Sequence, residues 1–159
     1  MELSDSHYWK VVRFFYVIFA LMLAIAVITR DKPTYNLRND LVVGCYGTNN
    51  GPSISLNSDG MKILQGEFPR IGFHLEASKT GIDLVSHAPL EAEMTPDGYR
   101  FRIQKRGLAT ISPFYKVING RAYPTFDTAG SDGFQMLSSD GAVLNYQSVD
   151  PVFCEETLP

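Results

Sequence analysis

The chain divides into one long apolar run near its N-terminus and a much longer part in which apolar and polar residues alternate. The run extends from Phe14 to Ile28 and contains no charged residue, glycine or proline. An α-helix over this run is about 22 Å long, and a start at Tyr8 brings it to the thickness of a bilayer core. We therefore predict a transmembrane helix at residues 14–29, with residue 8 as an alternative start, through which Phe14–Ile28 contacts the lipid bilayer.

This helix divides the chain into segments. Residues 1–13 form a short N-terminal tail, residues 30–40 a polar juxtamembrane linker, and residues 41–159 a separate domain. Cleavage as a signal peptide is an alternative to a retained anchor, because Ala24 and Ala26 provide small residues at the spacing that signal peptidase recognises. Against cleavage, the apolar run continues beyond them to Ile28. Basic residues lie on both sides of the run, so the flanking charges do not decide the orientation in the membrane.

Beyond the linker, the pattern is typical of half-buried β-strands. Apolar and polar residues alternate at 53–56, 70–77 and 99–104, which places the apolar side chains on one face of a sheet. Turn sequences rich in Asp, Asn and Gly separate these stretches. They predict hairpins at Ile54–Ile63, Met94–Ile103, Phe114–Phe126 and Phe134–Tyr146. The fold class is therefore all-β, with roughly nine or ten strands in an up-and-down barrel or a two-sheet antiparallel sandwich.

The two cysteines lie at the two ends of this domain. Cys45 falls in the first predicted strand and Cys154 is close to the C-terminus. If the first and last strands are neighbours in the sheet, the two residues are well placed for a disulfide. A disulfide persists in an oxidising compartment, so the pair favours a periplasmic or extracellular location for the domain. The alternative is two unrelated buried thiols.

Charge is unevenly distributed, although the net charge is only −3. Residues 100–121 contain six basic and no acidic residues, whereas residues 122–159 contain six acidic and no basic residues. A localised basic surface would bind an anionic lipid, an envelope polymer or an acidic protein. The alternative is that the bases pair with the acidic C-terminal block. The acidic overall charge argues against nucleic acid as a ligand. The candidate partner-binding residues are Arg100, Arg102, Lys105, Arg106, Lys116 and Arg121.

The sequence contains few residue patterns that are typical of a catalytic site. His74 and Glu76 are two residues apart on one predicted strand and therefore share a face, which would suit a hydrolase or a metal-dependent enzyme. The same residues also fit an ordinary solvated face, and no third group is indicated by the spacing. We therefore assign no catalytic residue, no metal ligand and no cofactor, and we consider an enzyme the less favoured class.

These observations favour a single-pass membrane protein of the cell envelope whose β-domain acts by binding, as an accessory or interaction module. One alternative is a carrier that holds a small apolar ligand inside the barrel, in a cavity lined by Phe73, Phe101 and Ile103. A second alternative is the enzyme that uses His74 and Glu76.

Overall fold

The computed structural model describes residues 5–28, 37–107 and 109–155, and within the first range the side chains of residues 9, 10 and 12–22. The chain forms two compact units, one at Met1–Thr34 and the other at Tyr35–Pro159. The first unit contains helix α1 (Asp5–Ile28), which begins before the predicted residue 14 and also before residue 8. Of the predicted linker, residues 30–36 lie outside the described residues.

The helix is present, but its predicted role in the membrane is not supported. Among the residues that the structure describes, no helix combines the length and the apolar character needed to cross a bilayer.

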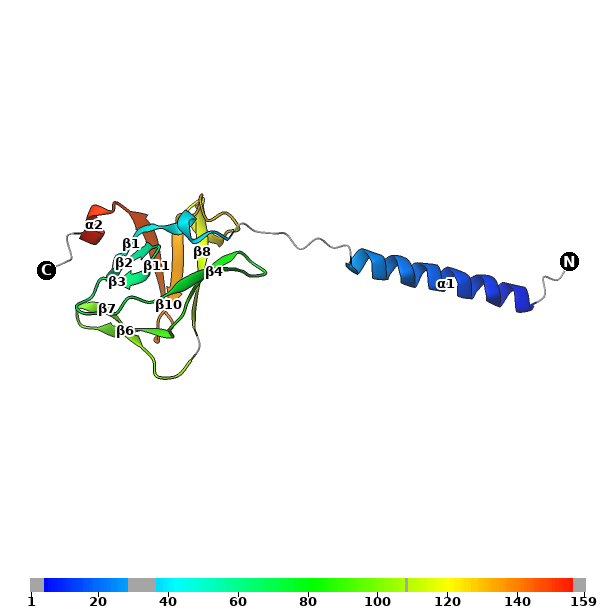
Figure 1. Cartoon of the computed structure of the whole chain (residues 1–159), viewed down its shortest axis with the longest axis horizontal. Helices are drawn as coiled ribbons and strands as arrows, with labels where there is room; N and C mark the ends of the chain where they lie inside the picture. Colours follow the sequence, from blue (N-terminus) through cyan, green and yellow to red (C-terminus); the bar gives the residue numbers. More distant parts are fainter. Residues whose placement is uncertain (1–4, 29–36, 108, 156–159) are drawn as a thin grey trace. The chain divides into compact units, whose positions relative to one another are not determined.

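The second unit is mostly β, as predicted. Its described residues form eleven strands, a 3-10 helix and a short C-terminal helix (Figure 1). The elements are η1 (Asn39–Val42), β1 (Gly44–Thr48), β2 (Gly51–Asn57), β3 (Gly60–Ile63), β4 (Phe73–Ala77), β5 (Ile82–Ser86), β6 (Leu90–Thr95), β7 (Gly98–Ile103), β8 (Thr110–Ile118), β9 (Arg121–Pro124), β10 (Gly133–Leu137), β11 (Val143–Val149) and α2 (Val152–Glu155).

Eight of these strands form a nearly closed, barrel-like antiparallel sheet. Their order is β3-β2-β1-β11-β10-β8-β5-β4, and β9 pairs with β8 outside this path. An isolated antiparallel bridge between Met61 of β3 and Ile71, just before β4, joins the two ends of the series. Both backbone hydrogen bonds of this bridge are formed, at 2.7 and 2.9 Å. Of the two architectures left open by the sequence, the observed sheet is therefore closer to the barrel, but its order is not up-and-down throughout, because β8 lies beside β5 and β6–β7 forms a separate sheet.

All four predicted hairpins are present, because the turn sequences fix them locally. They are β2–β3, β6–β7, β8–β9 and β10–β11. The β8–β9 turn illustrates the cause: Asn119 and Gly120 have positive φ angles of 52° and 76°, as a two-residue hairpin turn requires.

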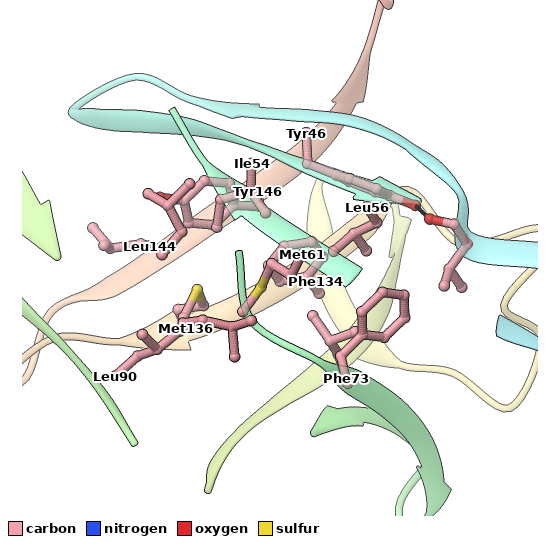
Figure 2. Close-up of a cluster of buried hydrophobic side chains, with 14 of the residues drawn as sticks. Tyr46, Ile54, Leu56, Met61, Phe73, Leu90, Phe134, Met136, Leu144 and Tyr146 are labelled. Carbon is pink, nitrogen blue, oxygen red and sulfur yellow. Dashed lines mark hydrogen bonds between the residues drawn. The ribbon is translucent and has the colours of Figure 1, made fainter. Parts of the chain in front are cut away.

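Side chains fill the interior of the barrel. Tyr46, Phe134 and Tyr146 come from three different strands, and the ring of Phe134 lies 5.1 Å from that of Tyr46 and 5.2 Å from that of Tyr146 (Figure 2). The two tyrosine hydroxyls are satisfied, since Tyr46 donates to the Val42 carbonyl and Tyr146 to the Pro52 carbonyl. Burial raises the pKa of both, that of Tyr46 to about 12. Both tyrosines therefore stay neutral and act as core residues with one polar group each.

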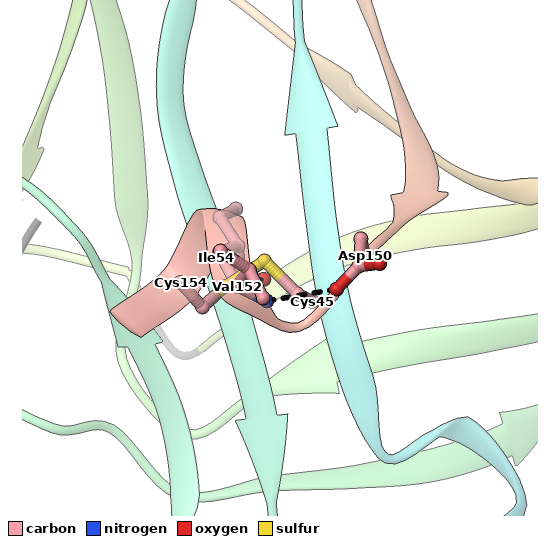
Figure 3. Close-up of a disulfide and its surroundings, with 5 residues drawn as sticks. All are labelled: Cys45, Ile54, Asp150, Val152 and Cys154. Carbon is pink, nitrogen blue, oxygen red and sulfur yellow. Dashed lines mark hydrogen bonds between the residues drawn. A yellow bond between two sulfur atoms is a disulfide. The ribbon is translucent and has the colours of Figure 1, made fainter. Parts of the chain in front are cut away.

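The first and last strands in chain order, β1 and β11, are neighbours in the sheet, and the predicted disulfide is present. Cys45 of β1 lies opposite Val149 of β11, and after β11 the chain turns back through α2. Cys154 in α2 is bonded to Cys45 with a Cα–Cα distance of 5.9 Å (Figure 3), within the usual range. The α2 backbone is also held by the Asp150 carboxylate, which accepts a hydrogen bond from the Val152 amide at 3.1 Å.

Candidate binding surfaces

The β6–β7 hairpin forms a separate two-stranded sheet that packs against the barrel. Its inward side chains, Leu90, Ala92, Tyr99 and Phe101, belong to the common hydrophobic core. The outward positions of β7 therefore carry Arg100 and Arg102 on a surface that is firmly attached to the domain.

Three groups of the barrel fix the backbone of this hairpin by polar contacts. The Tyr99 amide donates to the Asn50 carbonyl in the β1–β2 turn at 2.6 Å. The Phe101 amide donates to Oε1 of Gln65 at 2.8 Å, and the Ser139 amide donates to the Ala92 carbonyl at 2.9 Å. The hairpin is thus tied to three loops that are distant from it in sequence.

A side-chain contact completes this attachment. The Tyr99 hydroxyl donates to Oδ2 of Asp140 at 2.9 Å. Hydrogen bonds from Ser138, the Ala142 amide and Tyr99 hold the pKa of Asp140 below its usual range. Asp140 is therefore a charged acceptor that links the β10–β11 turn to β7.

Among the residues that the structure describes, the six basic residues form no ion pair with the acidic C-terminal block. Arg102 lies between two carboxylates of the neighbouring strand β6, 2.6 Å from Glu91 and 2.7 Å from Glu93. Within the described ranges, Arg102 is the only one of the six in an ion pair. The two-residue turn at Pro96-Asp97 sets this pairing, because it places Glu91 opposite Arg102 and Glu93 opposite Arg100.

The structure distributes these bases over two surfaces. Arg100, Arg102, Lys105 and Arg106 lie on β7 and the segment that follows it, and we call Arg100, Lys105 and Arg106 the β7 cations. Lys116 and Arg121 lie near the turn of the β8–β9 hairpin, away from the start of β8, where Thr110 contacts Leu90 of β6. All six side chains are exposed.

Open clefts adjoin the β7 cations. One, of about 560 Å³, is lined by Glu91 and by residues 102–106. A second, of about 760 Å³, lies between the β1–β2 turn and the β6–β7 turn and includes Arg100, Asp97 and Gln65. Most of the residues that line the two clefts are polar or charged, so the clefts offer a hydrophilic partner hydrogen bonds and ion pairs.

Of the three residues expected to line a carrier cavity, two belong to the hydrophobic core and the third is exposed. Phe73 and Phe101 are packed in the core, with 7% and 4% of their surface exposed. Ile103 is 41% exposed and lies in the cleft beside Arg102. The expectation that Ile103 faces the interior was therefore wrong, because β7 has already left the core at its last residue.

His74 has a partner that the sequence did not indicate. Its Nδ1 lies 3.1 Å from Nε2 of His87, and the two rings are 5.3 Å apart between centroids. The two strands bring the residues together, since His74 lies on β4 and His87 directly follows β5. The separation of 13 residues gives no signal at sequence level, because it depends on the register of the β4–β5 pair.

Glu76 does not join this pair. It lies opposite Asp83 in the β4–β5 ladder, and burial together with the nearby Glu76 carboxylate raises the pKa of Asp83, against the hydrogen bond from Ser78. Among the residues that the structure describes, no group of three or more His, Cys, Asp or Glu side chains is arranged to hold a metal ion.

The outer surface of the β-domain thus carries exposed cations beside open clefts and two adjacent imidazoles. No protein-family model, no curated protein and no solved structure matches this chain.

Proposed function

We propose that this protein is a membrane-tethered module of the cell envelope whose β-domain lies outside the cytoplasm and binds an anionic partner through the β7 cations. The observation that carries the proposal is that these three exposed bases have no carboxylate partner among the described residues and lie beside open polar clefts on a rigidly attached hairpin. Arg102 is excluded from the set because Glu91 and Glu93 already neutralise it.

Binding is favoured over transport in the barrel interior because that interior is occupied. Phe114, Phe134 and Tyr146 are fully buried, and protein cores packed in this way leave no room for a ligand. Contacts with a partner therefore occur on the outer surface.

The proposed tether rests on the amino-acid sequence of α1. The run Phe14–Ile28 has no charged residue, and the apolar side chains described on it are exposed, for example Phe15 and Phe19 at 65%. Exposed apolar side chains in such number are costly in water. The side chains of residues 23–28, which complete the run, lie outside the described residues.

The location outside the cytoplasm is supported by the Cys45–Cys154 disulfide, since reducing compartments keep thiols free. If free thiols are blocked in acid-quenched intact cells, we expect both cysteines to escape modification and to react only after a subsequent reduction. Mass spectrometry of the two cysteine peptides measures this. Cysteines that are blocked in the first step would contradict the proposed location.

The anionic partner is tested with heparin as a probe polymer and the full chain in a neutral detergent. We expect Lys105→Ser with Arg106→Ser to weaken binding roughly tenfold or more, because each base near an anionic surface contributes about 1 kcal/mol. The affinity should also decrease as salt increases.

Two further double variants remove the same amount of charge elsewhere. Lys62→Ser with Lys79→Ser removes bases outside the six candidates, and Lys116→Ser with Arg121→Ser removes those of the β8–β9 hairpin. We expect both to bind heparin much like the wild type. An equal loss in all three double variants would indicate a general charge effect and would refute the assignment to the β7 cations.

A further inference from the structure

The outer surface of β4 and β5 carries two imidazoles whose nitrogens are close together and accessible. Nδ1 of His74 and Nε2 of His87 are 3.1 Å apart, and both residues are exposed. Two nitrogens bound to one zinc ion at about 2.05 Å lie about 3.3 Å apart in tetrahedral geometry and about 2.9 Å apart at a right angle. The observed separation falls between these values.

We propose that His74 and His87 form a binding site for one divalent transition-metal ion such as Zn²⁺. Imidazole nitrogen is a preferred ligand of these ions. In the structure the two nitrogens point toward each other in a hydrogen bond, and a modest tilt of each exposed ring turns both lone pairs toward a common point. Water molecules complete the coordination, because no third protein ligand converges on the pair within the described ranges.

The backbone around His87 supports this arrangement. The His87 amide donates to the Gly72 carbonyl at 2.8 Å, and the His87 ring lies over Gly72. A Cβ at position 72 would lie only 2.5 Å from Nδ1 of His87. The ring therefore keeps its place because residue 72 has no side chain, and this gives a way to disturb the pair without removing either imidazole.

The surrounding charge also favours a cation. Glu76 is on the same strand and the same face as His74, and Asp83 lies opposite Glu76. Neither is a ligand, but both carboxylates lie two residues along the strands from the His74–Val85 pair. They create a negative potential that attracts divalent cations. This proposal does not depend on the membrane tether or on the anionic partner.

The test is a Zn²⁺ titration of the full chain, followed by calorimetry, with His7→Ala in every variant so that the third histidine does not contribute. We expect one ion per chain, and at least about a tenfold loss of affinity for both His74→Ala and His87→Ala. Wild-type affinity in either histidine variant would overturn the proposal.

Two glycine variants separate geometry from ligand identity. Gly72→Ala keeps both imidazoles but displaces the His87 ring, so we expect a loss of affinity. Gly44→Ala is the matched control, because its Cβ would only reach ordinary contact with Tyr46 at 3.8 Å, and we expect unchanged affinity. Equal affinity in the two alanine variants would refute the geometric argument.

A measurement on the protein with both histidines intact covers the case in which a variant does not fold. In proton NMR, Zn²⁺ should shift the imidazole resonances of His74 and His87 together, with the same saturation point. Shifts of one imidazole without the other, or of neither, would overturn the shared site.

Discussion

Replacing Cys45 and Cys154 together by serine is expected to lower the free energy of unfolding by about 4–5 kcal/mol. The disulfide joins residues 109 positions apart, so almost the whole β-domain lies inside the loop that it closes. In the unfolded chain such a cross-link removes many conformations, and its loss stabilises the unfolded state. Urea unfolding of the double variant and the wild type at neutral pH measures the difference.

The control is a substitution in the same helix that leaves the disulfide intact. Phe153 lies in α2 between Val152 and Cys154, and 59% of its surface is exposed. Phe153→Ser should change the free energy of unfolding by no more than about 0.5 kcal/mol, as is usual for surface positions. A double cysteine variant that loses less than about 1 kcal/mol would contradict the entropic account.

The four predicted hairpins show which parts of the fold can be predicted from short stretches of sequence. Each has its turn residues within two or three positions of the strands it joins, and the backbone angles required at Asn119 and Gly120 are readable from the residue types. The Arg102 ion pairs also follow from local information. Once the two-residue turn is placed at Pro96-Asp97, the register sets Glu91 opposite Arg102.

The closure of the barrel could not be predicted from the sequence, because it depends on which distant strands pair with each other. The bridge from Met61 to Ile71 connects the two ends of the sheet, and its absence would leave an open sheet made of the same strands. Strand β5 was not predicted either. It has the burial pattern of a strand covered on both sides, with only Asp83 partly exposed, so it lacks the alternation that indicates a half-buried strand.

The candidate sites likewise differ in whether they depend on contacts between distant residues. The basic residues were recognised because charge composition is visible without a fold. The partner of His74 was not, since the proximity of His87 follows from the pairing of Phe73 with Ser86. A register shift of one residue would have turned one imidazole to the opposite face. Sites formed across strands therefore require the structure, even when every residue in them is known.

Gly133→Ala is expected to destabilise the domain by more than about 4 kcal/mol, or to prevent folding, because this position combines two constraints. Gly133 has a φ angle of +155°, which residues with a side chain rarely adopt. In addition, a Cβ there would lie 1.7 Å from the carbonyl oxygen of Tyr146. That oxygen belongs to the backbone of β11, so relief of the clash requires β10 and β11 to separate.

A second glycine isolates the effect of the backbone angle. Gly141, in the β10–β11 turn, also has a positive φ angle of +84°, but no atom lies within 4 Å of a Cβ built there. Gly141→Ala should therefore cost only about 1–2 kcal/mol, the usual penalty for this conformation. Urea unfolding of both variants measures the difference. Of the two glycines, only Gly133 lies against the backbone of a paired strand. Similar losses of unfolding free energy in the two variants would therefore contradict the predicted clash with the Tyr146 carbonyl oxygen.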